Sequence, residues 1–307
     1  MAARSKNRPV KVPRSILILA KILDVVSPKL LTLLAARLFT TPIRHKIPKR
    51  EIHMVRNSSQ SMLTIDAIGK EICIYRYGSG DKKIVLVHGW SGRGTQLVKI
   101  ADALVANGYE VISFDAPAHG KSSGKTTLMP EFVASIHEID RTFGPFEAAI
   151  GHSLGGMSVL NALKHGLIIN SAIIIGSGDI VSDIITEFVQ KLRLPRKYNA
   201  LLRQHFERNT NETMESFSAY LAAKEVKIPT LVIHDKDDYE VPVSCAHHIH
   251  KHLQQGKIHI TEKLGHRKIL GDPTVIETIM QFINDTNHES ELITADNLIS
   301  DRMPGTK

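Results

Sequence analysis

A Gly-x-Ser-x-Gly pattern spans residues 151–155 and directly follows an apolar run that ends at Ile150. A serine hydroxyl is a weak nucleophile and must be exposed on a tight strand-to-helix turn, where larger flanking side chains would clash. Gly151 and Gly155 remove those clashes. The pattern therefore favours Ser153 as a nucleophile; the alternative is a glycine-softened turn in which Ser153 only caps a helix.

A hydroxyl nucleophile needs a base that removes its proton and a carboxylate that orients this base. Asp235, Asp237 and Asp238 follow the apolar run 231–234, and His266 comes later, in a strand-to-helix loop. The chain order of serine, acid and histidine fits this kind of topology. Since the chain has sixteen histidines, the alternative for His266 is an ordinary histidine in a surface loop.

The elements that must position these residues alternate between short β-branched runs and longer helical patterns. This alternation predicts an open, three-layer α/β fold with a mostly parallel sheet, in which a hairpin around Gly69 joins the first two strands. The expected strands are 62–68, 71–77, 83–88, 110–114, 148–151, 171–175, 230–234 and 258–262, and the expected helices are 95–107, 129–143, 154–165, 244–253 and 273–284.

Three regions flank or interrupt this body, which spans residues 51–285. Residues 1–50 form a basic amphipathic helical segment, and residues 286–307 form a polar tail without periodicity that we expect to be mobile. About fifty residues separate the strand ending near Ile175 from the next one, which predicts a helical cap over roughly residues 179–227. Its aromatic and aliphatic residues favour an acyl or aromatic substrate group, whereas its arginines either meet an anionic group or are merely solvated.

Charge is distributed unevenly along the chain. The net charge is +8, but residues 1–50 alone carry twelve Lys and Arg against Asp24, a net of +11, and the remainder has a net of −3. The body is therefore not basic, and aromatics make up only 5%, so nucleic acid is not an expected partner.

The basic segment contains two apolar helical runs, 15–26 and 29–39, separated by Pro28. Neither run reaches the roughly 20 apolar residues of a bilayer span, and charges at Lys21 and Asp24 argue against a signal peptide. Two interpretations remain. The helices either lie on an anionic membrane surface or pack on the main domain or a partner subunit.

Several other residues of the chain are of types that can carry chemistry. Cys73 and Cys245 are too few for a disulfide framework, which favours a reduced, cytoplasmic compartment, with or without peripheral contact to the cytoplasmic membrane face. His248 and His252 have a helical spacing that can hold a metal, but no carboxylate partner accompanies them, so a solvated helix face is the preferred interpretation. No cofactor and no metal is expected.

The residues from about 60 to 285 resemble the α/β-hydrolase fold superfamily, in its serine hydrolase, esterase-like and lipase-like branch. The resemblance rests on five motifs taken together: His88-Gly89-Trp90, the Asp115-to-Ser122 turn, the 151–156 elbow, the 234–242 loop and Gly265-His266. It departs from the family at Ala118, where glycine is usual, and in lacking the glycine-rich oxyanion loop of some lipases and esterases.

The resemblance implies a role for five residues. Ser153 matches the nucleophile, His266 the base and Asp238 the acid, because the family's acid lies four residues before the proline of its motif. Asp235, Asp237 and Asp179 remain alternatives for the acid. The N–H groups of Trp90 and Leu154 match the oxyanion hole. Asp115, His119 and Ser122 either touch substrate or merely form a turn.

The sequence thus predicts a serine hydrolase that cleaves a carboxylic ester or thioester of a small molecule through an acyl-enzyme. Acyl transfer to an alcohol and hydrolysis of a C–C bond use the same triad and stay open. A non-catalytic, membrane-associated scaffold is the alternative of a different class, and a broken triad would be its mark.

Overall fold

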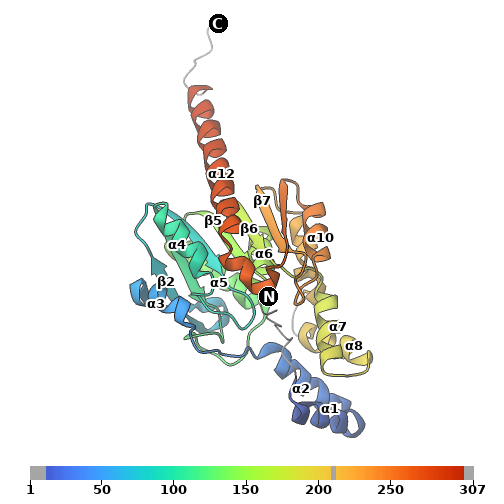
Figure 1. The fold of residues 1–307 in the computed structure, drawn as a ribbon. Coiled ribbons are helices and arrows are strands. Elements are labelled where there is room, and N and C mark those ends of the chain that lie inside the picture. Colours follow the sequence, from blue (N-terminus) through green and yellow to red (C-terminus); the bar gives the residue numbers. More distant parts are fainter. Residues whose placement is uncertain (1–11, 209–211, 301–307) are drawn as a thin grey trace, which may run out of the picture.

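The chain folds around one sheet in which the strands lie in the order β1-β2-β4-β3-β5-β6-β7-β8 (Figure 1). The computed structural model describes residues 12–208 and 212–300, with side chains described as far as residue 288. The strands are β1 Ser59–Ile65, β2 Lys70–Tyr77, β3 Lys82–Val87, β4 Tyr109–Asp115, β5 Phe146–His152, β6 Ile169–Ile175, β7 Thr230–Asp235 and β8 Gly256–Thr261.

The strands from β4 to β8 in this order all pair in parallel, whereas β2 pairs antiparallel with both β1 and β4. This confirms the predicted α/β class with a mostly parallel sheet, and also the hairpin, since Gly69 has a φ of 61°. The first strand ends at Ile65, earlier than expected, because Asp66–Ile68 form a 3-10 turn that leads into Gly69.

Helices cover both faces of the sheet. The helices are α1 Arg14–Val26, α2 Pro28–Thr40, α3 Ile52–Asn57, α4 Val98–Ala106, α5 Met129–Phe143, α6 Leu154–Lys164, α7 Val181–Lys191, α8 Lys197–Glu207, α9 Ala219–Ala223, α10 Ser244–His252, α11 Gly265–Lys268 and α12 Pro273–Ser300. Short 3-10 turns add Lys49–Glu51, Asp66–Ile68, Met214–Phe217 and Ile269–Gly271.

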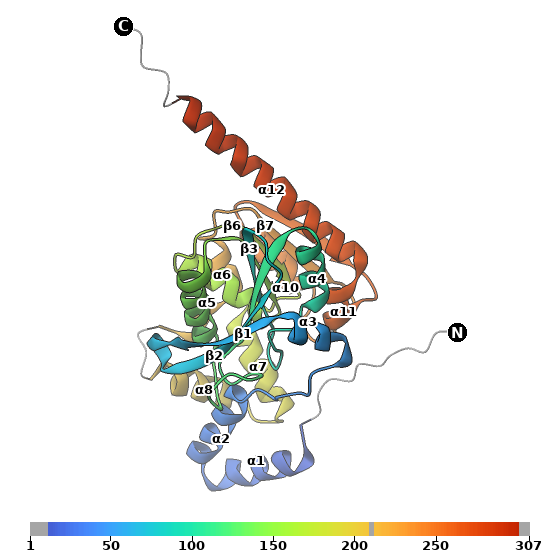
Figure 2. The ribbon, with the colours of Figure 1, turned by 90° about the vertical axis from the view of Figure 1, so that its left-hand side faces the viewer.

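Two apolar cores form because side chains alternate between the faces of each strand. Ile84 and Leu86 of β3 belong to the core that includes residues of α4 and α12. Val85 and Val87 belong to the other core, with residues of α5, α6 and α10. Figure 2 shows α4 and α12 on one side of the sheet and α5 and α6 on the other. Both faces are therefore covered, as near-continuous apolar strands require.

The chain between β6 and β7 contains α7, α8, the 3-10 turn at Met214–Phe217 and α9. Tyr198 of α8 is fully buried in this region. The arginines of this cap all lie on its exposed surface, which agrees with the interpretation that they are solvated; they are Arg193, Arg196, Arg203 and Arg208.

The N-terminal segment forms a pair of helices, α1 and α2, that lies beside α7 and α8 of the cap (Figures 1 and 2). Leu31, Ala35 and Ala36 of α2 are buried there. Residues 12–50 thus pack on the domain, as one of the two sequence interpretations held, although much of α1 stays exposed.

The last helix differs from its sequence-based expectation. We expected it to end at Asn284 and to be followed by a non-periodic tail, but α12 continues to Ser300 and projects from the body (Figure 2). No proline or glycine occurs between Pro273 and Pro304, so no residue there breaks the helix. Residues 301–307 of the expected tail lie outside the described residues. Within the described chain, no helix has the length and apolar character that crossing a membrane requires.

Candidate active site

Ser153 occupies a sharp turn between β5 and α6. Its φ of 54° is unusual for a residue other than glycine. A Cβ atom at Gly151 would lie 2.4 Å from the carbonyl oxygen of Gly155, and one at Gly155 would lie 2.2 Å from that of Val87. Both glycines are therefore required by close backbone contacts. The Ser153 side chain does not cap α6, so the simple N-cap interpretation does not describe its hydroxyl.

Asp238 and His266 meet in a buried hydrogen bond. The Nδ1 atom of His266 donates to Oδ2 of Asp238 at 2.7 Å, and both side chains are less than a tenth exposed. The other carboxylate oxygen accepts from the backbone N–H groups of Glu240 and Val241 at 2.8 and 2.9 Å. Burial alone would raise the pKa of Asp238, but these hydrogen bonds and the His266 charge outweigh it and lower the pKa.

The remaining candidate acids have other partners. Asp235 accepts hydrogen bonds from Thr261 and from backbone N–H groups of its own and the neighbouring loop, whereas Asp237 accepts from the N–H of Lys263. Asp179 pairs with Nδ1 of His248 at 2.5 Å. Of the four acids considered, Asp238 is the one that the structure brings to His266.

The end of β6 brings the serine and the histidine close together. The N–H of Ser153 donates to the carbonyl of Ile175 at 2.9 Å, and a Cβ atom at Gly176 would lie 3.3 Å from Nδ1 of His266. Within the described chain, Ser153 and His266 are not hydrogen-bonded to each other. Such bonds between catalytic groups often tighten only when substrate binds.

The predicted oxyanion donors lie on the two loops that flank Ser153. Trp90 follows β3 and Leu154 begins α6, and neither backbone N–H donates to another described residue. Gly89 brings the first loop against Ser153, since a Cβ there would lie 3.0 Å from Cβ of Ser153. The side-chain oxygen of Gln96 accepts from the N–H of Gly89 at 3.0 Å and holds this loop in place.

Two buried histidines also organise this loop. Nε2 of His88 accepts from the N–H of Ala116 at 2.9 Å, and Nε2 of His119 accepts from the N–H of Ser91 at 3.0 Å. Burial lowers the pKa of His88 to about 4 and that of His119 to about 3, so both rings are neutral near pH 7. Each ring then carries its proton on Nδ1 and donates to a carbonyl, that of Gly89 or Pro117.

The other residues of the Asp115 turn have structural roles. The Asp115 carboxylate accepts from Tyr75 and from the N–H groups of Gly94 and Lys121. The Ser122 hydroxyl bridges the Asp115 carbonyl and the N–H of Cys73. All three residues weighed in this turn are buried, and these contacts support the interpretation that they form a turn rather than touch substrate.

Ala118, the departure from the family's glycine, adopts a φ of 66°, which costs an alanine more than a glycine. Arg44 of the N-terminal segment donates to the carbonyls of Ala118, Ser122 and Gly124 at 2.9, 2.7 and 3.1 Å. Arg44, which precedes the domain in the sequence, therefore stabilises this strained turn. This contact joins residues more than seventy positions apart, so no local pattern predicts it.

His152 is a further residue of the site whose role sequence reasoning missed. Its Nε2 atom lies 2.9 Å from the carbonyl oxygen of His266, and the two rings lie 4.6 Å apart between centroids. Since a carbonyl only accepts, His152 is the donor. Burial keeps its pKa well below the usual value, which leaves its Nδ1 atom unprotonated and without a partner among the described residues.

His248 and His252 have hydrogen-bond partners within the protein. His248 is bound to Asp179, and Nδ1 of His252 lies 2.8 Å from the carbonyl of His248. No group of three or more potential metal-ligating side chains occurs within the described residues.

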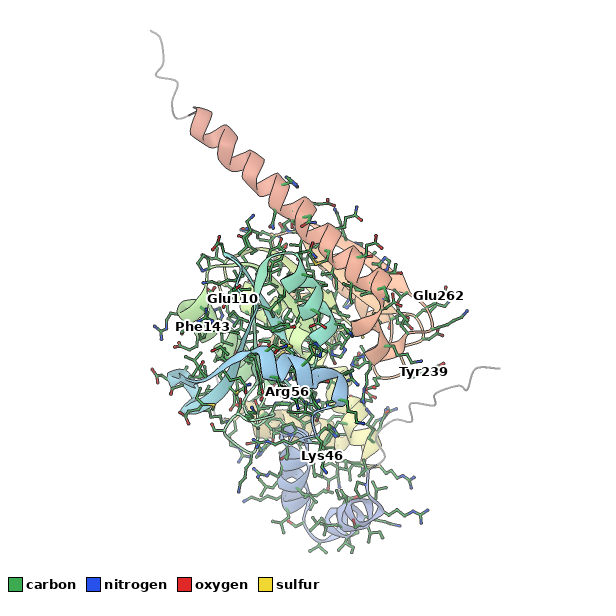
Figure 3. The ribbon with its side chains drawn as sticks, turned by 60° about the vertical axis from the view of Figure 1, so that its left-hand side comes forward. Lys46, Arg56, Glu110, Phe143, Tyr239 and Glu262 are labelled. Carbon is green, nitrogen blue, oxygen red and sulfur yellow. The ribbon has the colours of Figure 1, made fainter. Side chains whose placement is uncertain are left out.

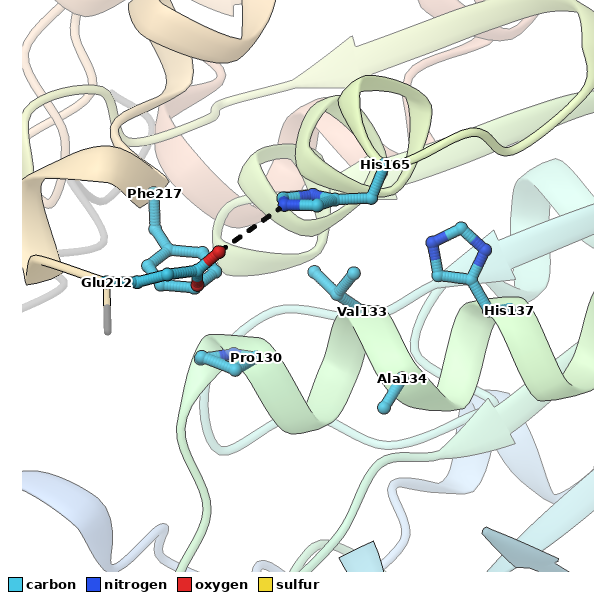
Figure 4. A pocket seen from close by; sticks show the side chains of 7 residues that line it. All are labelled: Pro130, Val133, Ala134, His137, His165, Glu212 and Phe217. Carbon is cyan, nitrogen blue, oxygen red and sulfur yellow. Dashed lines mark ion pairs between the residues drawn. The ribbon is translucent and has the colours of Figure 1, made fainter. Parts of the chain in front are cut away.

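An open pocket of about 360 Å³ lies elsewhere, between α5 and the C-terminal end of α6 (Figure 4). His165 and Glu212 approach each other to 3.9 Å at its rim. Ser153 precedes α6 and His165 follows it, so about 18 Å of helix separates the two. The pocket is therefore distinct from the candidate active site; it is lined by Pro130, Val133, Ala134, His137, His165, Glu212 and Phe217.

Comparison with known proteins identifies a family for this chain. The model of the alpha/beta hydrolase family matches residues 84–276. The chain is 24% identical over 261 residues to the 2-hydroxy-6-oxononadienedioate/2-hydroxy-6-oxononatrienedioate hydrolase of Escherichia coli, an alignment that covers 68% of this chain and 90% of that protein. An esterase structure from Pyrococcus furiosus has a TM-score of 0.62 at 16% identity, and covers 80% of this chain and 97% of its own.

A second relative aligns over a shorter stretch. The dihydrolipoyllysine-residue acetyltransferase component of the acetoin cleaving system of Cupriavidus necator is 31% identical over 131 residues, which is 40% of this chain and 34% of that protein. The chain thus spans about a third of this relative. The family model, by contrast, covers more than half of the chain, from β3 to the start of α12. The chain belongs to the alpha/beta hydrolase family and is an enzyme.

Proposed function

We propose that this enzyme is a serine hydrolase that cleaves a carboxylic ester or thioester through an acyl-enzyme. The observation that carries the proposal is the buried 2.7 Å hydrogen bond between His266 and Asp238, next to a serine on a strained turn. A carboxylate, an imidazole and a hydroxyl in this order are the parts that nucleophilic acyl transfer requires.

In the proposed reaction, the Ser153 oxygen attacks the carbonyl carbon of the substrate while Nε2 of His266 takes the hydroxyl proton. Asp238 accepts from Nδ1, so it fixes the ring and stabilises the imidazolium that forms. The bond from the acyl carbon to the leaving group then breaks, C–O in an ester and C–S in a thioester, and His266 gives the proton to the departing oxygen or sulfur. Water, deprotonated by His266, attacks the acyl carbon and releases the acid and Ser153.

The oxyanion of each tetrahedral intermediate would accept from the N–H groups of Trp90 and Leu154. Both groups donate to no other described residue, and removing one such donor costs about 3 to 4 kcal/mol of transition-state stabilisation in a measured case. The neutral rings of His88 and His119 support these donors by fixing the loop that carries Trp90.

Two observations bear on the substrate. The alpha/beta hydrolase relatives include an esterase, which agrees with ester cleavage. The cap between β6 and β7 leaves its arginines exposed to solvent, which favours an uncharged acyl or aromatic group over a strongly anionic one.

Hydrolysis of a C–C bond is the second candidate. It is favoured by the alignment with the Escherichia coli hydrolase, which extends over 90% of that protein. The partial match to an acetyltransferase component supports acyl transfer less strongly, because it covers a third of that protein.

The test measures turnover of p-nitrophenyl esters, from acetyl to dodecanoyl, and of the C–C substrate named for the Escherichia coli relative. We expect the wild-type enzyme to hydrolyse the esters. In Ser153→Ala and Asp238→Asn, kcat should fall by about a thousandfold or more. The control Ser61→Ala should keep the wild-type kcat. Ester turnover that survives Ser153→Ala would overturn the proposal. Cleavage of the C–C substrate without ester turnover would establish the second candidate, and an alcohol-dependent ester product would indicate acyl transfer.

A further inference from the structure

The α1–α2 pair is fixed to the cap by specific contacts. The Asp24 carboxylate accepts from the Tyr198 hydroxyl at 2.7 Å and pairs with Lys197 at 2.9 Å. Phe39 of α2 packs against Phe188 and Phe206, with ring centroids 5.0 and 5.7 Å apart. The α1–α2 pair therefore packs against the cap in a defined position.

Although one face of α1 packs inward through Ala20, a second apolar face points to solvent. We call this second face the outer stripe. Successive members are one or three positions apart, which places them on one side of the helix. They are Ile18, Leu19, Ile22, Val25 and Val26, with exposed fractions of 61, 44, 54, 85 and 69%.

The outer stripe continues into the next helix, where Leu30 and Leu33 are 52% and 45% exposed. Of the exposed large apolar side chains among the described residues, nine of thirteen lie between Ile18 and Ile47. Such a concentration marks an interaction surface, whereas single exposed apolar residues need no explanation.

Positive charge borders this apolar surface. Arg14, Lys21 and Lys29 are exposed, and Arg37 is exposed further along α2. Asp24 is the one acid among residues 1–50, and it is already paired with the cap. Figure 3 shows the side chains of both helices extending outward, and Lys46 on the stretch that follows them. The surface therefore combines exposed leucines, isoleucines and valines with uncompensated bases.

We propose that the outer stripe, with Leu30 and Leu33, docks on an anionic lipid bilayer. Apolar side chains enter the interface and neighbouring lysines and arginines meet negatively charged headgroups, which is how amphipathic helices bind such surfaces. A second copy of this chain fits the surface less well, because it would bring like charges at Arg14, Lys21 and Lys29 together at an interface whose core is normally depleted of charge.

Docking through this surface would place the cap and the loop that carries Trp90 near the bilayer. The α1–α2 pair lies beside α7 and α8, so the cap comes next to the bilayer (Figures 1 and 2). The segment that follows α2 reaches the oxyanion loop, since the N–H of Ile43 donates to the Ser91 hydroxyl at 2.9 Å. A membrane-bound enzyme thus holds its cap and oxyanion loop close to the lipid surface.

The test is flotation of the full-length protein with vesicles of phosphatidylcholine alone or of phosphatidylcholine with phosphatidylglycerol. We expect wild type to float with the anionic vesicles, and the double variant Ile22→Glu/Val25→Glu to float about tenfold less or worse. Lys21→Glu/Lys29→Glu should lose flotation on anionic vesicles, and high salt should have the same effect on wild type. The matched control is Ile168→Glu, which introduces the same charge at a position that is 83% exposed and lies outside the proposed docking surface.

Folding of each variant is checked by its thermal unfolding. Turnover of a water-soluble ester is a second check, because the substituted positions lie outside the candidate active site. Absent flotation of wild type, or equal flotation of wild type and the Ile22/Val25 double variant, would overturn the proposal. A wild-type protein that is dimeric without vesicles, with a monomeric double variant, would assign the surface to a second copy instead. Because the binding measurement needs no catalysis, it stands or falls independently of the proposed hydrolase activity.

Discussion

His152 directly precedes Ser153, and its imidazole contacts the proposed base, His266. It donates to the carbonyl of His266 and not to the ring, so it fixes the backbone from which the His266 side chain projects. We therefore expect His152 to act as a positioning residue. Misplacement of a catalytic group by about 1 Å is enough to cost two orders of magnitude in rate.

Replacing His152 by phenylalanine keeps a ring in the buried site but removes the donor. We expect kcat for a soluble ester to fall by about tenfold to a hundredfold, while KM changes by less than about threefold, because substrate contacts remain. The exposed His247→Phe on α10 is the matched control and should retain wild-type kinetics. An unchanged kcat in His152→Phe, with the fold intact, would show that the hydrogen bond does not position the base.

The two buried, neutral histidines His88 and His119, which hold the loop after β3, make stability depend on pH. In the unfolded chain both rings take up a proton near the ordinary pKa of 6.5, whereas in the folded chain they do so near 4 and 3. The unfolded state therefore binds more protons between these values. The stabilisation is complete above about pH 6.5 and is lost as the pH falls toward 4, by about 1.4 kcal/mol per pH unit for each histidine.

Urea unfolding between pH 7.5 and pH 4.5 measures this dependence. We expect the free energy of unfolding to fall with decreasing pH, and the slope to be reduced in His119→Gln by the contribution of one group. A slope that His119→Gln leaves unchanged would mean that the buried ring does not titrate as described.

Part of the candidate site was accessible from the sequence. Ser153, His266 and the group of aspartates after β7 were identified by spacing, and the family resemblance singled out Asp238, which the structure brings to His266. Their catalytic roles remain predictions. The bond between His152 and His266 joins positions 114 residues apart, and only the folded chain reveals it.

At the scale of elements, the turn between β5 and α6 depends on close backbone contacts. The N-terminal end of α6 approaches the end of β3 so closely that Gly155 has no room for a side chain. The same approach brings Gly89 of the following loop next to Ser153. Packing of these elements thus sets the distance between Ser153 and the loop that carries Trp90.

Gly155→Ala would place a methyl group 2.2 Å from the carbonyl oxygen of Val87, a rigid backbone atom. We expect the free energy of unfolding to fall by about 3 kcal/mol, because the helix must shift, and ester turnover to fall with it. Gly271→Ala is the matched control, since its nearest neighbour would be a flexible lysine carbon at 3.6 Å, and it should change stability by less than about 0.5 kcal/mol. Equal effects of both substitutions in urea unfolding would contradict this account.

The elements themselves were predictable to different degrees. Apolar β-branched runs and helical periodicity correctly predicted the class, the hairpin around Gly69, and the strand and helix that flank Ser153. The extension of α12 to Ser300 was missed because a polar segment without periodicity gives no signal that separates a solvated helix from a loop. The short helix α3 is too brief to show a periodic pattern.

At the scale of the whole molecule, the alpha/beta hydrolase domain has its cap and its basic helical pair on the same side (Figure 1). The sequence offered packing or membrane contact as alternatives for this pair, because one amphipathic pattern serves both. In the structure, α1 buries one apolar face and exposes another, so the two interpretations apply to different faces. Periodicity alone could not separate them, since both faces consist of the same residue types.

The proposed reaction depends on Ser153 being an activated nucleophile. The most direct measurement is the intact mass of the protein after treatment with a fluorophosphonate, on wild type and on Ser153→Ala under identical conditions. We predict a single covalent adduct on wild type, localised to the peptide that contains Ser153, and none on the variant. An adduct that persists on Ser153→Ala, or a folded wild-type protein that remains unmodified, would contradict the claim.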